Sequence, residues 1–269
     1  KQNNQSLGTY IKNQQFEKLL TETIPKLNES TISELSKTSY DAPISQISEM
    51  LFYIPDYFYK KENDKNDNQI ISTTACEYVY EFSKWLLDHD ANPNDNIKYG
   101  VSCYLKSAGL KTPDLLKFLI TNKSDIDLMQ KDGQGKDAFV YAVINNSIEN
   151  FEFLCEKIEL DVNKKYVLLD GKTLLHLACA SANEPMIDLL LSKGAKLSQR
   201  DHLDNLPHEM IPVQESHEVN PMALLDPEFS KKEQEKKIFF EKCDLLFEKL
   251  EHLLVKEKQE ETNPKLAEE

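Results

Sequence analysis

The residues best suited to chemistry in this chain are its five cysteines and six histidines, and their spacing selects no site. The cysteines form no CxxC pair, and the histidines form neither HExxH nor the paired Cys and His spacings typical of zinc sites. A thiol nucleophile needs a base and an orienting group beside it, and the sequence singles out no such set. GQGK at 133–136 is too short for a phosphate-cradling loop. We therefore predict no catalytic residues, no metal site and no cofactor.

The cysteines indicate a reducing compartment. They are odd in number, and most lie in apolar helical patterns where a reduced thiol serves as a small core residue. The opening residues KQNNQSLGTY contain no apolar signal core. We expect a cytoplasmic location.

Composition and charge exclude two classes of partner. With 40% hydrophobic and 29% charged residues, the chain can bury a core. A formal net charge of −14 repels a phosphate backbone and an anionic membrane surface, which are usually met by clustered Lys and Arg. No run approaches the ~18 to 20 apolar residues that a membrane span requires. We expect neither nucleic-acid binding nor a membrane span.

The elements that must position any site recur along the chain. Gly100, Gly135 and Gly171 lie 35 and 36 residues apart, and alignment on these glycines superposes the apolar triplets at 118–120, 153–155 and 189–191. The same period extends back to Asp67 and forward to Asp204. Each period holds two short helical patterns and a turn, which is typical of a stacked repeat array.

Residues 171–195 carry a specific family signature. GKTLLHLA followed by LLLSKGA resembles the ankyrin repeat, with Leu174 in place of the usual Pro. The motif histidine is kept at His176, whereas Leu105 and Val140 occupy its position in the other two clear copies. The resemblance implies an all-α ankyrin-repeat solenoid of about four to five repeats, several of them degenerate.

The resemblance covers about half of the chain and divides it into segments. The expected segments are a helical N-terminal cap at 1–64, ankyrin repeats at 65–212, a linker at 213–229, an amphipathic C-terminal helix at 230–260 and a disordered acidic tail at 261–269.

The C-terminal helix allows two interpretations. Its apolar residues recur at spacings of four and three from Phe239 to Leu253, which makes a stripe too wide to be left in water. The stripe either packs back on the last repeat or, because a period of 3.5 also suits a two-stranded seam, associates with another chain through 238–254. We expect a monomer, with this association as the alternative.

The resemblance also implies where a partner protein docks. In ankyrin-like stacks, the β-turn tips and the exposed ends of the first helices line one concave face. The turn tips implied here are Lys98, Tyr99, Val101, Gly133, Gln134, Lys136, Leu169, Asp170, Lys172, His202, Leu203 and Asn205. The implied helix ends are Leu110, Ile144, Asn145 and Ser181.

The sequence therefore favours a non-catalytic module that binds a partner protein. The alternative is a regulatory or substrate-recruiting part of an enzyme, with catalytic residues in the terminal helical regions or outside this sequence. The Lys-, Asn- and Ile-rich composition and the tail KEKQEETNPKLAEE resemble ankyrin-containing effectors of intracellular bacteria, which leave by type IV secretion. In that interpretation the protein acts on a host protein in the host cytoplasm as a virulence factor.

Overall fold

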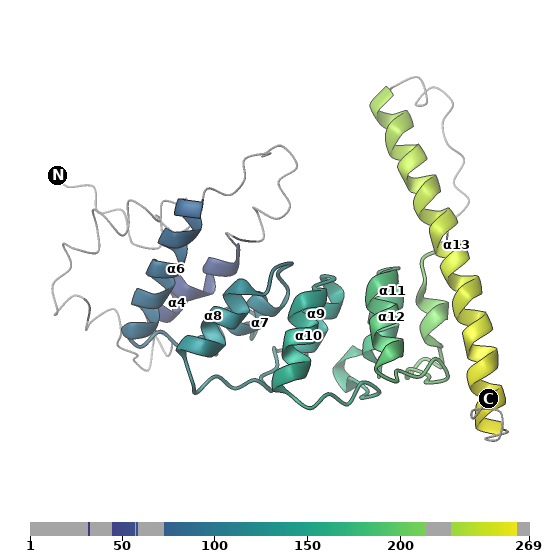
Figure 1. Cartoon of the computed structure of the whole chain (residues 1–269), viewed down its shortest axis with the longest axis horizontal. Helices are drawn as coiled ribbons and strands as arrows, with labels where there is room; N and C mark the ends of the chain where they lie inside the picture. The colour runs from purple at the N-terminus through teal and green to yellow at the C-terminus, as the bar shows by residue number, and fades with distance from the viewer. Residues whose placement is uncertain (1–31, 33–44, 57, 59–72, 214–226, 263–269) are drawn as a thin grey trace. The chain divides into compact units, whose positions relative to one another are not determined.

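The computed structural model describes residues 32, 45–56, 58, 73–213 and 227–262 (Figure 1). The chain divides into two compact units, Lys1–Glu159 and Leu160–Glu269. Most of the expected N-terminal cap and linker, and residues 263–269 of the expected tail, lie outside the described residues. Within the described part, the regular elements are helices joined by turns, with isolated β-bridges at Lys98–Val101 and Tyr166–Lys172.

Most of the helices come in pairs along the chain, a short first helix followed by a longer second helix (Figure 1). The elements of the first unit are α4 (Gln46–Phe52), α6 (Thr73–Asp88), α7 (Cys103–Ala108), α8 (Asp114–Asn122), α9 (Ala138–Ile144) and α10 (Ile148–Lys157). Those of the second unit are η3 (Val167–Leu169), α11 (Leu174–Ala180), α12 (Glu184–Ser192), η4 (Pro207–Met210) and α13 (Pro227–Thr262).

The first helix of each repeat starts three residues after the repeat's glycine, and the residue before the helix is its N-cap. Ser102 and Asp137 accept hydrogen bonds from the backbone N–H groups of Leu105 and Val140, at 3.3 and 3.2 Å, and so cap α7 and α9. Such caps satisfy N–H groups that have no partner inside the helix. Thr173 occupies the same position before α11.

The first unit is held together by apolar packing and by one buried amide. Helices α4, α6 and α8 share a hydrophobic cluster that includes Leu51, Phe82 and Leu119. The Nδ2 of the fully buried Asn150 donates to the carbonyl oxygens of Ser107 and Leu110, at 3.3 and 2.5 Å. Since these carbonyls lie in the last turn of α7 and just after it, the amide of α10 ties one helix pair to the one before it.

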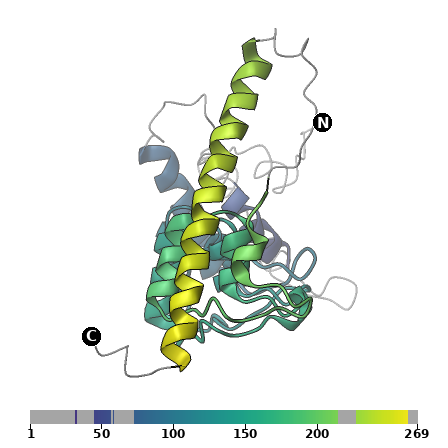
Figure 2. The ribbon, with the colours of Figure 1, turned by 90° about the vertical axis from the view of Figure 1, so that its right-hand side faces the viewer.

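The second unit includes the long C-terminal helix. Helix α13 begins at Pro227, three residues before the expected start, and Pro is well suited to the first helical position because it lacks an N–H. Figure 2 shows α13 running beside the last repeat. The buried stripe of the helix is Cys243, Leu246, Leu250 and Leu254.

Polar contacts fix α13 on the last repeat. Lys249 Nζ lies 2.9 Å from carboxylate oxygens of both Glu184 and Asp188 on α12. The Glu257 carboxylate accepts the backbone N–H groups of Leu197 and Ser198, at 2.8 and 3.2 Å. The part of the stripe from Cys243 to Leu254 therefore packs on its own chain. Phe239, at the start of the stripe, is 42% exposed, and association through 238–254 stays a prediction.

A pair of leucines on α13 tests this packing. We expect Leu250→Ala, at a fully buried position, to lower the free energy of unfolding by about 2–5 kcal/mol, because it removes apolar contacts and leaves a cavity. Leu245→Ala is the matched control, since Leu245 is 67% exposed and its truncation should change stability by less than about 0.5 kcal/mol. Urea unfolding measures both; equal effects would contradict packing of this face on the repeat.

Candidate protein-binding surface

Consecutive turns of the first unit are hydrogen-bonded to each other. The turn at 97–101 is closed by Ile97 N–H to Val101 O at 3.0 Å, and its tip passes through positive φ at Tyr99 and Gly100. The Gly133 N–H of the next turn donates to Tyr99 O at 3.2 Å. A Cβ at Gly100 would collide with the backbone of Gly133, so this contact requires glycine.

The second unit has the same kind of contact between its own two turns, at 166–172 and 201–205. The His202 N–H donates to Asp170 O at 2.7 Å, and the His202 ring occupies the space that a Cβ on Gly171 would need. Lys172 is ion-paired with Asp170 at 3.1 Å and lies 3.7 Å from Asp201. The tips at 166–172 and 201–205 are therefore side by side.

An aspartate shapes two of these turns, three residues before Gly135 in one and three residues before Asp204 in the other. Asp132 Oδ1 accepts the N–H groups of Gln134 and Lys136, both at 2.8 Å. Asp201 Oδ1 accepts those of Leu203 and Asn205, at 2.8 and 2.9 Å. The sequence analysis missed Asp132 and Asp201, although an alignment on Gly135 and Asp204 places them at the same position of the repeat.

Asp201 is ionised in this setting. Burial raises its pKa, but the hydrogen bonds from Asn205 and Leu203 and the charge of Lys172 outweigh burial, so that the pKa lies below its ordinary value. The turn is thus held by an anionic acceptor, whose hydrogen bonds are stronger than those of a neutral one.

His176 links α11 to the turn that follows the α11–α12 pair. The Thr173 N–H donates to His176 Nδ1 at 3.2 Å, so Nδ1 is the acceptor and Nε2 carries the proton that meets Asn205 O at 3.1 Å. Burial lowers the pKa of His176, with opposing contributions from Asn205 and Asp201. The ring is therefore neutral at pH 7 and has a structural role.

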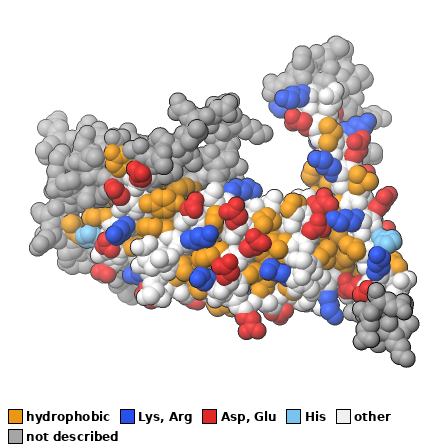
Figure 3. Space-filling model, viewed as in Figure 1, with side chains coloured by type: hydrophobic (Ala, Val, Ile, Leu, Met, Phe, Trp, Pro, Cys, Tyr) orange, Lys and Arg blue, Asp and Glu red, His pale blue; other side chains and the backbone are white. Residues whose placement is uncertain are grey.

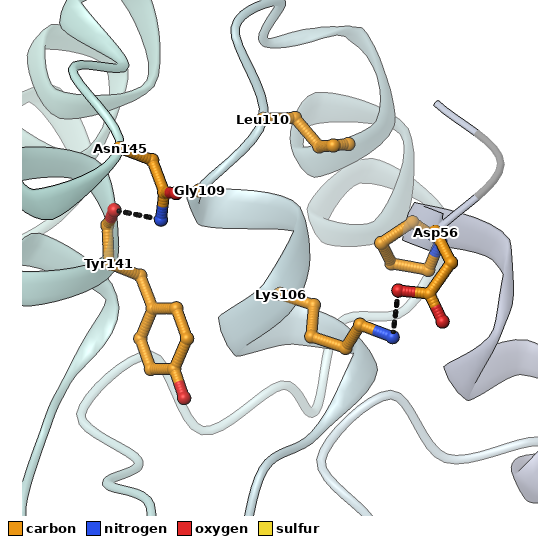
Figure 4. Close-up of a pocket in the computed structure, with 7 residues that line it drawn as sticks. Asp56, Lys106, Gly109, Leu110, Tyr141 and Asn145 are labelled. Carbon is orange, nitrogen blue, oxygen red and sulfur yellow. Dashed lines mark hydrogen bonds and ion pairs between the residues drawn. The ribbon is translucent and has the colours of Figure 1, made fainter. Parts of the chain in front are cut away.

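The ends of the first helices in the first unit border a pocket of about 230 Å³ (Figure 4). Lys106 on α7 and Tyr141 on α9 stand 35 residues apart in equivalent places, and both line it together with Asn145. Pro55 and Asp56 close the other side. Within each unit, we use the name turn face for its turn tips together with the ends of its first helices.

The structure places the predicted residues unequally on the turn face. Tyr99 is 82% exposed and Ile144 is 42% exposed. Leu110 is a correction, because it is 2% exposed and belongs to the hydrophobic cluster of the first unit. Of the remaining predicted residues, Lys98, Gln134, Asp170, Ser181, His202, Leu203 and Gly133 are exposed, and Val101, Lys136, Asn145, Leu169, Lys172 and Asn205 are half-buried.

Two of the half-buried residues already have partners within the chain. Lys172 is paired with Asp170, and Asn205 donates its side-chain amide to Asp201 while its carbonyl meets His176. In the first unit the structure brings Tyr99 and the Gln134 turn together, and in the second unit it brings Asp170 and His202 together.

The second unit exposes apolar residues that the sequence analysis did not select. Val167 and Leu168 are 72% and 69% exposed in η3, beside Leu203, which is 67% exposed. The 166–172 turn is two residues longer than the turn at 97–101, since it is closed by Tyr166 N–H to Lys172 O where the other is closed by Ile97 N–H to Val101 O. Because of these two extra residues, the exposed side chains do not lie at the positions predicted by counting from Gly171.

Three buried thiols, Cys103, Cys179 and Cys243, are poor nucleophiles. Burial raises the pKa of Cys103 and of Cys179 to about 12, and burial also raises that of Cys243. These side chains are therefore protonated thiols at pH 7. Across the residues that the structure describes, no three His, Cys, Asp or Glu side chains are grouped as metal ligands.

Comparison with known families decides what the repeats are. Residues 104–201 match the family model described as Ankyrin repeats (3 copies). The chain contains ankyrin repeats. The matched residues span the pairs α7–α8, α9–α10 and α11–α12, which confirms the predicted all-α ankyrin-repeat fold and covers three of the four to five repeats expected. No curated protein matches the chain.

Ankyrin repeats generally mediate protein–protein interaction, so the turn face is the surface to examine. The space-filling view shows hydrophobic side chains interspersed with both acidic and basic ones (Figure 3). No helix in the described ranges is both long enough and apolar enough to span a bilayer.

The buried neutral histidine gives the ankyrin repeats a pH-dependent stability. The folded-state pKa of His176 lies below the ordinary 6.5, so the unfolded chain binds the proton more readily. The stabilisation is complete above pH 6.5 and is lost as pH falls toward the folded-state pKa. We expect the free energy of unfolding to decrease over this range, as measured by urea titrations at stepped pH values.

The control for this prediction is His176→Gln, because Gln at this helix position can still accept the Thr173 N–H without titrating. We expect the variant to show a smaller decrease, with the remainder due to His208, whose pKa is also lowered by burial. An unchanged pH dependence in the variant would contradict the role assigned to His176.

Proposed function

We propose that this chain is a non-catalytic module that binds a partner protein through the turn face. The exposure of Tyr99 is the observation that carries the proposal. Its side chain is 82% exposed, on a backbone whose positive φ is fixed by the neighbouring Gly133 turn. A pre-positioned aromatic side chain that covers no core is suited to bury itself against a partner at little entropic cost.

The second unit supports the same proposal with a different surface. Val167, Leu168 and Leu203 are exposed on adjacent turns, next to the polar Asp170 and His202. Apolar residues rimmed by polar ones are typical of interaction sites. Because the turns are joined by a backbone hydrogen bond, these side chains are presented together rather than singly.

We also propose a source and a location for the partner. The composition and the glutamate-rich C-terminal residues resemble bacterial effectors, so the partner would be a host protein met in the host cytoplasm. This part of the proposal rests on sequence alone, and comparing eukaryotic with bacterial lysates tests it separately.

Affinity capture from eukaryotic cytosol and from bacterial lysate tests the proposed function. We expect the unaltered chain to retain a partner that is lost by a variant carrying Lys98→Ala, Tyr99→Asn and Gln134→Ala. All three residues are exposed on two adjoining turns. Asn tolerates the positive φ at position 99, so the variant should fold normally.

The matched control carries Asp114→Ala, Thr121→Ala and Glu152→Ala, three exposed positions on second helices away from the turn tips. This variant should retain the partner. A partner lost by the control and kept by the turn variant would contradict docking on the turn face. Capture only from the bacterial lysate would contradict the effector assignment and leave the binding function standing.

A further inference from the structure

The pocket between α7 and α9 has a size that suits one side chain. Its volume of about 230 Å³ is below the roughly 300 Å³ at which small-molecule pockets begin. The lining combines apolar surface from Pro55 and Leu110 with polar groups from Asp56, Tyr141 and Asn145 (Figure 4). The pocket opens on the turn face, where a partner protein would lie.

The one cationic group at the pocket is already occupied. Lys106 Nζ lies 2.6 Å from Asp56 Oδ1 and 3.1 Å from Phe52 O, and it stands 4.1 Å from the centre of the Phe52 ring. Its side chain is 18% exposed, against 48% for that of Asp56. The ammonium is therefore held against Phe52 and Asp56, whereas the Asp56 side chain, which also lines the pocket, stays partly exposed.

The remaining polar groups are hydrogen-bond acceptors. Asp56 uses one oxygen for Lys106, and a carboxylate has capacity for further donors. Asn145 spends its Nδ2 on Tyr141 O at 3.0 Å, so its amide oxygen is the group left to bind a ligand. Tyr141 donates its hydroxyl to Asp132 at 2.9 Å and keeps lone pairs on that oxygen.

The Tyr141 ring can receive a cation. Lys106 and Asp56 offset each other, and Asp132 behind the Tyr141 hydroxyl is offset by Lys111, whose Nζ donates to Asn145 O at 2.6 Å. Burial and the Asp132 hydrogen bond both raise the pKa of Tyr141, so the phenol stays neutral and its ring face remains available to a cation. The net charge of −14 attracts basic ligands over a longer range.

We propose that this pocket binds one arginine side chain of the partner protein. The inference rests on the proposed function and specifies the partner's chemistry. The planar guanidinium lies over the Tyr141 ring, and its several N–H groups donate to Asp56 and Asn145. The methylene stem of the arginine packs on Leu110, a buried residue that lines the pocket. An ammonium group is not planar and cannot donate two parallel hydrogen bonds as a guanidinium does, so lysine is the weaker ligand.

Titration with blocked amino acids tests the pocket without any partner. The probes are the N-acetyl, N′-methylamide derivatives of arginine, lysine and leucine, added to the ¹⁵N-labelled full chain and followed by amide chemical shifts. We expect saturable shifts at Gly109, Leu110 and Asn145 with the arginine probe, and binding at least about fivefold weaker with lysine. Equal shifts with the leucine probe would overturn the proposal in favour of an apolar pocket.

Variants separate the proposed contacts from folding. Asp56→Asn should weaken arginine binding by about fivefold or more, because a charge-assisted hydrogen bond is lost, while the exposed Asp114→Asn should leave it unchanged. Since Asp56→Asn also alters the Lys106 pair, a second comparison keeps the test decisive. Tyr141→Phe retains the ring and should still bind arginine, whereas Tyr141→Leu should not.

The outcomes distinguish this inference from the proposed function. Failure of the arginine probe, together with a partner captured through Tyr99, would overturn the pocket and leave the protein-binding function intact. Arginine binding that is identical in Tyr141→Leu and Tyr141→Phe would also overturn it. Saturable arginine shifts with no captured partner would support the pocket and contradict the wider proposal.

Discussion

The structure depends on hydrogen bonds between the backbones of consecutive turns. In each unit one such bond joins neighbouring tips, from Gly133 to Tyr99 and from His202 to Asp170. Each requires a close approach that a Cβ on Gly100 or Gly171 would prevent. Because a short helix pair cannot bury its apolar side alone, each repeat relies on the next, and the turns are brought into contact by the same stacking that buries the core.

The fixed turns explain why this surface can serve for binding. A side chain on a turn that is hydrogen-bonded to its neighbour loses little freedom when a partner covers it, so exposed residues such as Tyr99 and Leu203 are ready to make contact. The same stacking sets α7 beside α9 and thereby forms the pocket between Lys106 and Tyr141. The turn contacts follow from the repeat period, whereas the pocket also needs Pro55 and Asp56 from outside the repeats.

Sequence reasoning found what is periodic and missed what is not. The glycine spacing could be predicted because it recurs at fixed offsets, and the repeat at 171–195 because its motif, including His176, resembles the ankyrin signature. The same offsets placed Leu110 at the surface, whereas the turn toward α8 folds it into the core. Val167 and Leu168 follow from an insertion that offsets cannot register, and the pocket depends on Asp56, about 50 residues before Lys106 in the chain.

Hydrogen–deuterium exchange of the chain with its captured partner tests the use of the turn face most directly. The account predicts slower exchange in peptides covering 97–110 and 132–145 when the partner is bound, with no change over α8 at 114–122. Protection confined to α8, α10 or α13, with unchanged exchange at the turns, would contradict it.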